Sequence, residues 1–222
     1  MPATTALTRQ DYVKLMIEES ADLAGFLEGL DDSDWDVDSL CTGWKVRHVI
    51  SHMAVGHTMP MGKFLAAVLA ARGVVPRASY GLAVRFGDTH TPEQILAAFR
   101  AGTAGPPQGP ARFVAPPELF IDHLIHHQDI RRPLGRPRDI PTHRLVAAVE
   151  ALPRLNGQLK PKRRVRGLTL VAKDIDRRVG EGPEVYGPAE ALVMCAGGRS
   201  AALDELDGPG VSTLAARLRA EA

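Results

Sequence analysis

The side chains best suited to chemistry lie in residues 118–135, ELFIDHLIHHQDIRRPLG, which mix histidines and carboxylates with large apolar residues. An α-helix turns about 100° per residue. On that spacing one polar stripe runs along the segment, made by Glu118, Asp122, His126 and Asp129. Apolar residues flank the stripe, which predicts that it faces the interior of a helical bundle. Buried ionisable groups need partners, because removing them from water is costly.

A divalent metal ion meets this need, since carboxylate plus imidazole is a ligand set that zinc and similar ions accept. Asp122 and His126 stand four residues apart and can reach one ion from one helix. The third ligand has to come from elsewhere, and we expect His52, which stands with His48 in the segment VRHVISHMAVGH. Two histidines, one carboxylate and open positions are typical of a catalytic ion rather than a structural one.

The other polar residues of the segment have several interpretations. Asp129, one turn beyond His126, is expected to orient an imidazole N–H, or else to pair with Arg131, Arg132 or Arg136. We expect His123 and His127 to be exposed surface residues. The whole stripe can also be an ion-pair network that holds no metal.

Hydrophobic periodicity and capping signals predict the helices that position these groups. We expect a helix over residues 8–30 and a second from Thr42 towards Leu69, which Pro60 should kink or split. Residues 71–92 have no clear period and predict a long connection. A third helix follows Thr91, a fourth covers residues 116–134 and a fifth begins at Pro141. Between the third and fourth, AGTAGPPQGPAR predicts a flexible or lid-like loop.

The pattern changes near residue 160. RVRGLTLVAKDIDRRVGEGPEVYG alternates and carries turn signals, which predicts two or three strands, and helical segments follow. The fold class expected is α+β, mainly α. A helical bundle would span residues 1–160, and a small α/β domain residues 161–222.

Composition excludes several classes. The net charge of +1 argues against a dedicated nucleic-acid or membrane-surface binder. Two distant cysteines make no disulfide framework, and the N-terminal residues show no signal-peptide pattern, so we expect a cytoplasmic protein. No apolar run is long enough to span a bilayer. Nothing in the sequence decides between a monomer and a homodimer.

Three segments, in order, carry a resemblance to a known family. CTGWKVRHVISHMA resembles the Cys-x-Gly-Trp segment of the mycothiol-dependent maleylpyruvate isomerase family, a branch of the DinB-like bundles. DHLIHHQDIRRPLG resembles its Glu/Asp-x-x-x-His-x-x-Asp segment. Residues 167–218, with their Gly-Pro-Ala and Gly-Arg landmarks, look like its small C-terminal domain.

The resemblance implies a DinB-like four-helix bundle that binds zinc or another divalent ion through His52, Asp122 and His126. It implies a metal-dependent isomerase or transferase that uses mycothiol, a low-molecular-weight thiol, on a small anionic electrophile. Coordination makes a thiolate at neutral pH, which then adds to an activated double bond. The family more often has Glu at the position of Asp122, so Glu118 is a possible substitute ligand.

Arg199 matches the C-terminal arginine of the family, and the resemblance implies a catalytic role in which it binds the cofactor or an acidic substrate. Its alternative is a pair with Asp204 or Glu205. Cys41 is either a reactive thiol near a helix start or, as we favour, a packed residue. Two other functions remain open: a metal-dependent hydrolase, and a non-catalytic binding or regulatory protein on the same bundle.

Overall fold

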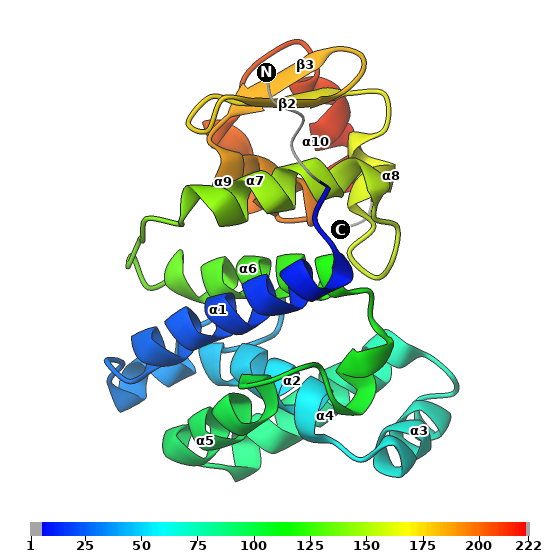
Figure 1. Ribbon diagram of the computed structural model, residues 1–222. Helices are drawn as coiled ribbons and strands as arrows, with labels where there is room; N and C mark the ends of the chain where they lie inside the picture. The colour runs from blue at the N-terminus through cyan, green and yellow to red at the C-terminus, as the bar shows by residue number, and fades with distance from the viewer. Residues whose placement is uncertain (1–5, 221–222) are drawn as a thin grey trace.

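The computed structural model describes residues 6–220 and is mainly helical, as predicted. Four helices form the bundle: α1 (Arg9–Leu27), α2 (Val46–Thr58), α5 (Pro92–Thr103) and α6 (Pro116–Arg131). In Figure 1, α1 lies along α6, and α2 and α5 lie beneath them. The bundle core contains large apolar side chains that are fully buried, among them Leu23, Ile50, Phe99 and Ile130.

The predicted helix starts at Thr8 and Thr91 are confirmed. Each of these residues caps its helix through a reciprocal capping box, with Asp11 and Gln94 respectively. The start of α2 is different: it begins at Val46 and not near Thr42. Gly43 adopts φ +76°, and the turn pairs Asp38 with Lys45 before the helix can begin.

Pro60 splits the second predicted helix, and α3 (Met61–Ala70) follows it. Residues 71–92, expected to be a long connection, instead contain α4 (Val75–Thr89), so that expectation was wrong. The buried positions of α4 are the small residues Ala78, Ala83 and Gly87, which allow close packing on α2. Pro76, Gly81 and Gly87 in this segment are typical of turns, which is why the sequence was interpreted as a connection.

The rest of the chain packs on the far side of α6. α7 (Thr142–Ala151) leads through α8 (Pro161–Val165) into the predicted strands: β1 (Thr169–Ala172), β2 (Arg177–Gly180) and β3 (Glu184–Gly187). Their order is β2-β1-β3, with β1 antiparallel to β2 and parallel to β3. α9 (Ala189–Ala196) and α10 (Val211–Arg219) complete this part (Figure 1).

One apolar core runs from α1 and α6 through α7 into α9 and β1. α7 packs against both α6 and α9, so the division after residue 160 stays a prediction. Short 3₁₀ helices connect the larger elements: η1 (Asp32–Asp36), η2 (Gly109–Phe113), η3 (Leu152–Arg154) and η4 (Ser200–Glu205). No helix in the described range has the length and apolar character needed to cross a membrane.

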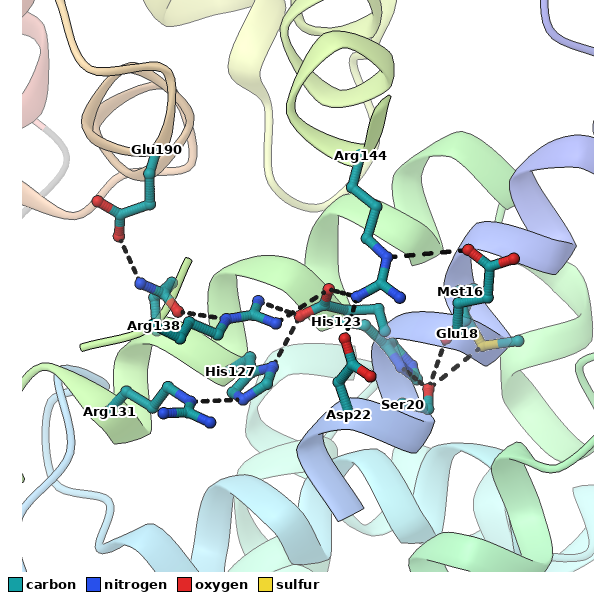
Figure 2. Close-up of polar contacts among 12 residues, drawn as sticks. Met16, Glu18, Ser20, Asp22, His123, His127, Arg131, Arg138, Arg144 and Glu190 are labelled. Atoms are coloured by element: carbon teal, nitrogen blue, oxygen red, sulfur yellow. Dashed lines mark hydrogen bonds and ion pairs between the residues drawn. The ribbon is translucent and has the colours of Figure 1, made fainter. Parts of the chain in front are cut away.

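A buried ion-pair network joins α1, α6 and α7, as Figure 2 shows around His127, Arg138 and Arg144. The Glu19 side chain is fully buried and pairs with Arg138, with Arg144 at 3.1 Å and with His127 Nδ1 at 2.7 Å. The prediction that His123 and His127 are exposed was wrong, since they are 1% and 0% exposed. Both rings have hydrogen-bond partners on other helices: Ser20 and His57 for His123, and Glu19 for His127. Nothing within residues 118–135 could indicate these partners.

Candidate metal centre

Helices α2 and α6 bring together the three residues that the sequence singled out. One ligand atom from each of His52, Asp122 and His126 lies within 4.8 Å of the others. Asp122 Oδ1 is 3.5 Å from His126 Nε2, and the rings of His52 and His126 meet edge-on with centroids 5.2 Å apart. The shorter Asp side chain therefore reaches the same point as the imidazoles, because it stands one turn before His126 on the same helix.

In both His52 and His126 the Nδ1 atom already has a hydrogen-bond partner, and Nε2 is left for a metal ion. The Nδ1 of His52 lies 3.0 Å from Ser79 Oγ on α4, and the Nδ1 of His126 lies 2.9 Å from Asp129 Oδ2. When each Nδ1–H donates to its oxygen, each Nε2 keeps a lone pair for a cation. This is how protein imidazoles that bind metal are usually held.

Arg199 holds the Asp129 carboxylate from the other side. Its Nε donates to Asp129 Oδ1 at 3.0 Å and its Nη2 to Oδ2 at 2.6 Å, while Nη1 donates to the carbonyl of Gly197. Burial alone would raise the pKa of Asp129, but the Arg199 charge outweighs it and holds this pKa well below its usual range. Asp129 therefore stays ionised next to the imidazole of His126, with Arg199 as its counter-ion.

The electrostatics of the three residues suit a cation. Burial lowers the pKa of His52 to about 4, so this ring is neutral at pH 7. Burial would also lower the pKa of His126, but the charge of Asp122, the neighbouring Cys41 sulfur and the hydrogen bond with Asp129 together raise it well above its usual value. These groups thus stabilise positive charge at His126, and a divalent ion can take the place of the proton.

A second group with metal-binding spacing shares His126 and consists of Cys41, His126 and Asp129. Cys41 Sγ lies 3.1 Å from Asp129 Oδ2, and Arg199 Nη2 lies 3.6 Å from the same sulfur. The guanidinium already neutralises Asp129 and would repel an added cation at this distance. The donor set of His52, Asp122 and His126 is therefore the better fit for a metal.

Two other candidates lie outside the cluster. Glu118, considered as a substitute ligand, accepts from the Leu159 N–H at 3.3 Å and belongs to neither group. His48 Nε2 lies 2.9 Å from Asp88 Oδ1 on α4. Arg199 pairs with Asp129 and not with Asp204 or Glu205.

The cluster forms one wall of a cavity of about 260 Å³, which His52 and Asp122 line. Most of the remaining lining is apolar and comes from α2, α3, α4, α6 and η2. A larger depression of about 480 Å³ lies near α9, but its arginines are occupied: Arg132 pairs with Glu190 and Glu205, and Arg138 with Glu19. The cavity beside the cluster thus joins open space to candidate ligands.

Sequence reasoning missed three polar residues near the cavity. Ser79 lies on α4, which was predicted as a connection. His57 and His123 line the cavity with their Nε2 atoms 3.2 Å apart, and His123 Nδ1 lies 2.8 Å from Ser20 Oγ. Burial lowers the pKa of His57 to about 4 and that of His123 to about 3, so the pair is neutral. In the sequence, His123 was noted only for its spacing of four residues from His127, and nothing indicated a role for His57.

Comparison with known proteins agrees with this architecture. Two crystal structures, of the mycothiol-dependent maleylpyruvate isomerase and of a mutant of it, are similar, with TM-scores of 0.60 and 0.59. Each is 16% identical in sequence, over 91% of this chain and 93% of the other, which shows a shared fold. None of the curated proteins matches the chain.

A family match covers more than half of the chain. Residues 17–131 match the family described as "Mycothiol maleylpyruvate isomerase N-terminal domain". The matched range contains α2 and α6 and hence all three residues of the candidate metal centre. The chain therefore belongs to the mycothiol maleylpyruvate isomerase N-terminal domain family.

Proposed function

We propose that this protein is a metal-dependent enzyme that uses mycothiol to isomerise a small electrophile or to transfer the thiol to it. The single observation that carries the proposal is the convergence of His52, Asp122 and His126 within 4.8 Å at the wall of a cavity. Family membership and the shared fold support mycothiol as the thiol.

A divalent ion held by His52, Asp122 and His126, with zinc the first choice, would lower the pKa of a bound thiol and polarise a substrate carbonyl. The protein's own residues prepare the site. Ser79 fixes the ring of His52, and Asp129 fixes that of His126. Arg199 and Asp129 are positioning residues in this account, because their charges are turned towards each other.

The anionic electrophile expected from the sequence fits the cavity poorly. The charged side chains in its lining are the carboxylates Glu118 and Asp122, and the lining has no lysine or arginine. The proposed function therefore rests on thiol and metal chemistry and not on recognition of substrate charge.

The test is turnover by the zinc-loaded protein of a cis enone, with and without mycothiol. We expect trans isomer or thiol conjugate to form faster than without protein, and only when both zinc and the thiol are present. Zinc-dependent cleavage of a small carboxylic ester, tested in parallel without any thiol, would support the metal-dependent hydrolase instead. A zinc-bound protein that accelerates neither reaction would support a non-catalytic role.

A further inference from the structure

The cavity beside the candidate metal centre has an unusual lining for an enzyme expected to act on anions. Apolar side chains from five elements form most of it, among them Met53, Met61, Phe64, Val75, Phe113 and Leu119. Its volume of about 260 Å³ is just below the range of about 300–1,000 Å³ typical of sites for drug-sized ligands. It therefore has room for a ring or a short chain.

The charge of the lining is negative. Asp122 belongs to the metal cluster, but Glu118 forms no ion pair within the described residues and accepts only the Leu159 N–H. With the reactive end of a ligand at the metal cluster, a carboxylate at its other end would lose its water without gaining a cation from the side chains there, and it would lie in a cavity that also contains the Glu118 carboxylate. An uncharged apolar group would instead gain free energy in proportion to the area that it buries.

Arg199, the residue that the sequence suggested for anion binding, does not change this balance. It is not part of the cavity lining, and its bidentate contact with Asp129 already neutralises its charge. A substrate anion would have to displace a buried carboxylate in order to reach it.

The outer wall of the cavity is apolar as well. α3 contains no buried residue, and Leu65 and Leu69 on its outer side are 58% and 80% exposed. Met61 and Phe64 on the same helix line the cavity. The helix thus presents apolar side chains to both the cavity and its surroundings.

From this lining we infer that the substrate is an electrophile with an uncharged, apolar body, which the cavity binds while the reactive carbonyl end lies at the His52–Asp122–His126 cluster. This inference rests on the proposed function for the identity of the ligand. An aryl enone belongs to this class. The thiolate sulfur bonds to its β carbon, the π pair moves to the carbonyl oxygen, and a solvent proton at the α carbon completes the conjugate. Loss of the thiolate instead of protonation restores the double bond and gives the isomer.

The test measures binding, so it does not depend on turnover. The probes are three unreactive 4-arylbutan-2-ones that carry a para isopropyl, carbamoyl or carboxylate group, titrated calorimetrically into the zinc-loaded full-length protein. Isopropyl and carboxylate have similar shapes and differ in charge. We expect the isopropyl probe to bind at least about tenfold more tightly than the carboxylate probe, with the carbamoyl probe between them.

A pair of variants on α3 tests whether the cavity causes this preference. Met61→Lys places a cation in the lining, whereas Leu69→Lys makes the same change on the exposed side of the helix. We expect Met61→Lys to shift the affinity ratio towards the carboxylate probe by about tenfold, which corresponds to about 1.4 kcal/mol, and Leu69→Lys to leave it unchanged. Phe64→Lys repeats the test if Met61→Lys does not fold.

Tighter binding of the carboxylate probe to the unmodified protein would overturn the inference, and so would equal shifts in the two lysine variants. The proposed function fails separately. If the probes bind in the expected order but no thiol-dependent turnover occurs, the proposed enzymatic function is rejected, whereas the preference of the cavity for apolar ligands is retained. Turnover combined with the reverse binding order would reject only the substrate class.

Discussion

Arg199 and His126 both bind one carboxylate, that of Asp129. Arg199 donates to both oxygens of Asp129, at 3.0 and 2.6 Å, and His126 Nδ1 lies 2.9 Å from Oδ2. The arginine comes from the segment after α9 and the histidine from α6. The C-terminal part of the chain thereby helps to fix the orientation of a candidate ligand in the bundle.

The first prediction concerns this contact. Asp129→Asn removes the charge that orients His126, so we expect zinc affinity to fall about 10- to 100-fold. Arg199→Lys loses the bidentate contact and should give a smaller loss. Competition with a chromophoric chelator measures the zinc affinity of each variant. Asp34→Asn is the matched control. Asp34 also pairs with an arginine, Arg136, at 2.8 Å, but it is not part of the metal centre. Equal affinities in Asp129→Asn and Asp34→Asn would show that Asp129 does not position the ligand.

The second prediction concerns the buried network of Figure 2. Glu19→Gln leaves Arg138 and Arg144 without their buried carboxylate, and we expect it to lower the free energy of unfolding by about 3 kcal/mol. Glu18 is 33% exposed at its side chain, so Glu18→Gln should change stability by less than about 0.5 kcal/mol. Urea unfolding at pH 7 compares the two. Similar losses would mean that the network contributes no more than a surface pair.

The same network predicts a pH dependence. Burial would raise the pKa of Glu19, but the hydrogen bond with His127 and the charge of Arg138 lower it from 4.5 to about 2. Because the folded-state pKa is the lower one, the ionised carboxylate stabilises the protein above about pH 4.5, and this contribution is lost as the pH falls towards 2. The gap in unfolding free energy between wild type and Glu19→Gln should therefore narrow from pH 5 to pH 2. A gap that stays constant over this range would contradict the assignment.

The fourth prediction tests the packing of α4 on α2. A Cβ at Gly87 would lie 2.6 Å from His48 Cδ2, so Gly87→Ala forces the helices apart and should destabilise the protein by about 1–3 kcal/mol. Gly81 lies on the same helix with nothing within 4 Å of its Cβ position, and Gly81→Ala should stabilise by about 0.5–1 kcal/mol. Thermal unfolding of the two variants should shift in opposite directions, and shifts of the same sign would be inconsistent with this packing.

Local signals in the sequence predicted much of the fold. Apolar periodicity predicted the helix over residues 8–30, and Thr91 carried a capping signal. Pro60 marked the break after α2, and turn residues bounded the three strands. α4 was missed because Pro76, Gly81 and Gly87 are typical of turns, and its small buried residues are buried only because α2 lies close by. The start of α2 was displaced by the Gly43 turn, which gives no periodic signal.

The candidate site could be predicted only in part. The spacing of Asp122 and His126 is a property of one helix, and the choice of His52 needed a guess about how two helices pack. The partners of the imidazoles are tertiary: Ser79 lies on a helix that was not expected, and Arg199 lies 70 residues beyond Asp129. Burial of His123 and His127 likewise depends on Ser20 and Glu19 of α1.

The central claim is that His52, Asp122 and His126 hold one metal ion. Its most direct test is elemental analysis of the purified full-length protein together with His52→Ala, His126→Ala and the matched control His48→Ala, which lies on the same helix as His52 but outside the cluster. We predict about one divalent ion per chain in the unmodified protein and the control, and far less in the other two. A full complement of metal in both His52→Ala and His126→Ala, or none in the unmodified protein after growth with zinc, would contradict the account.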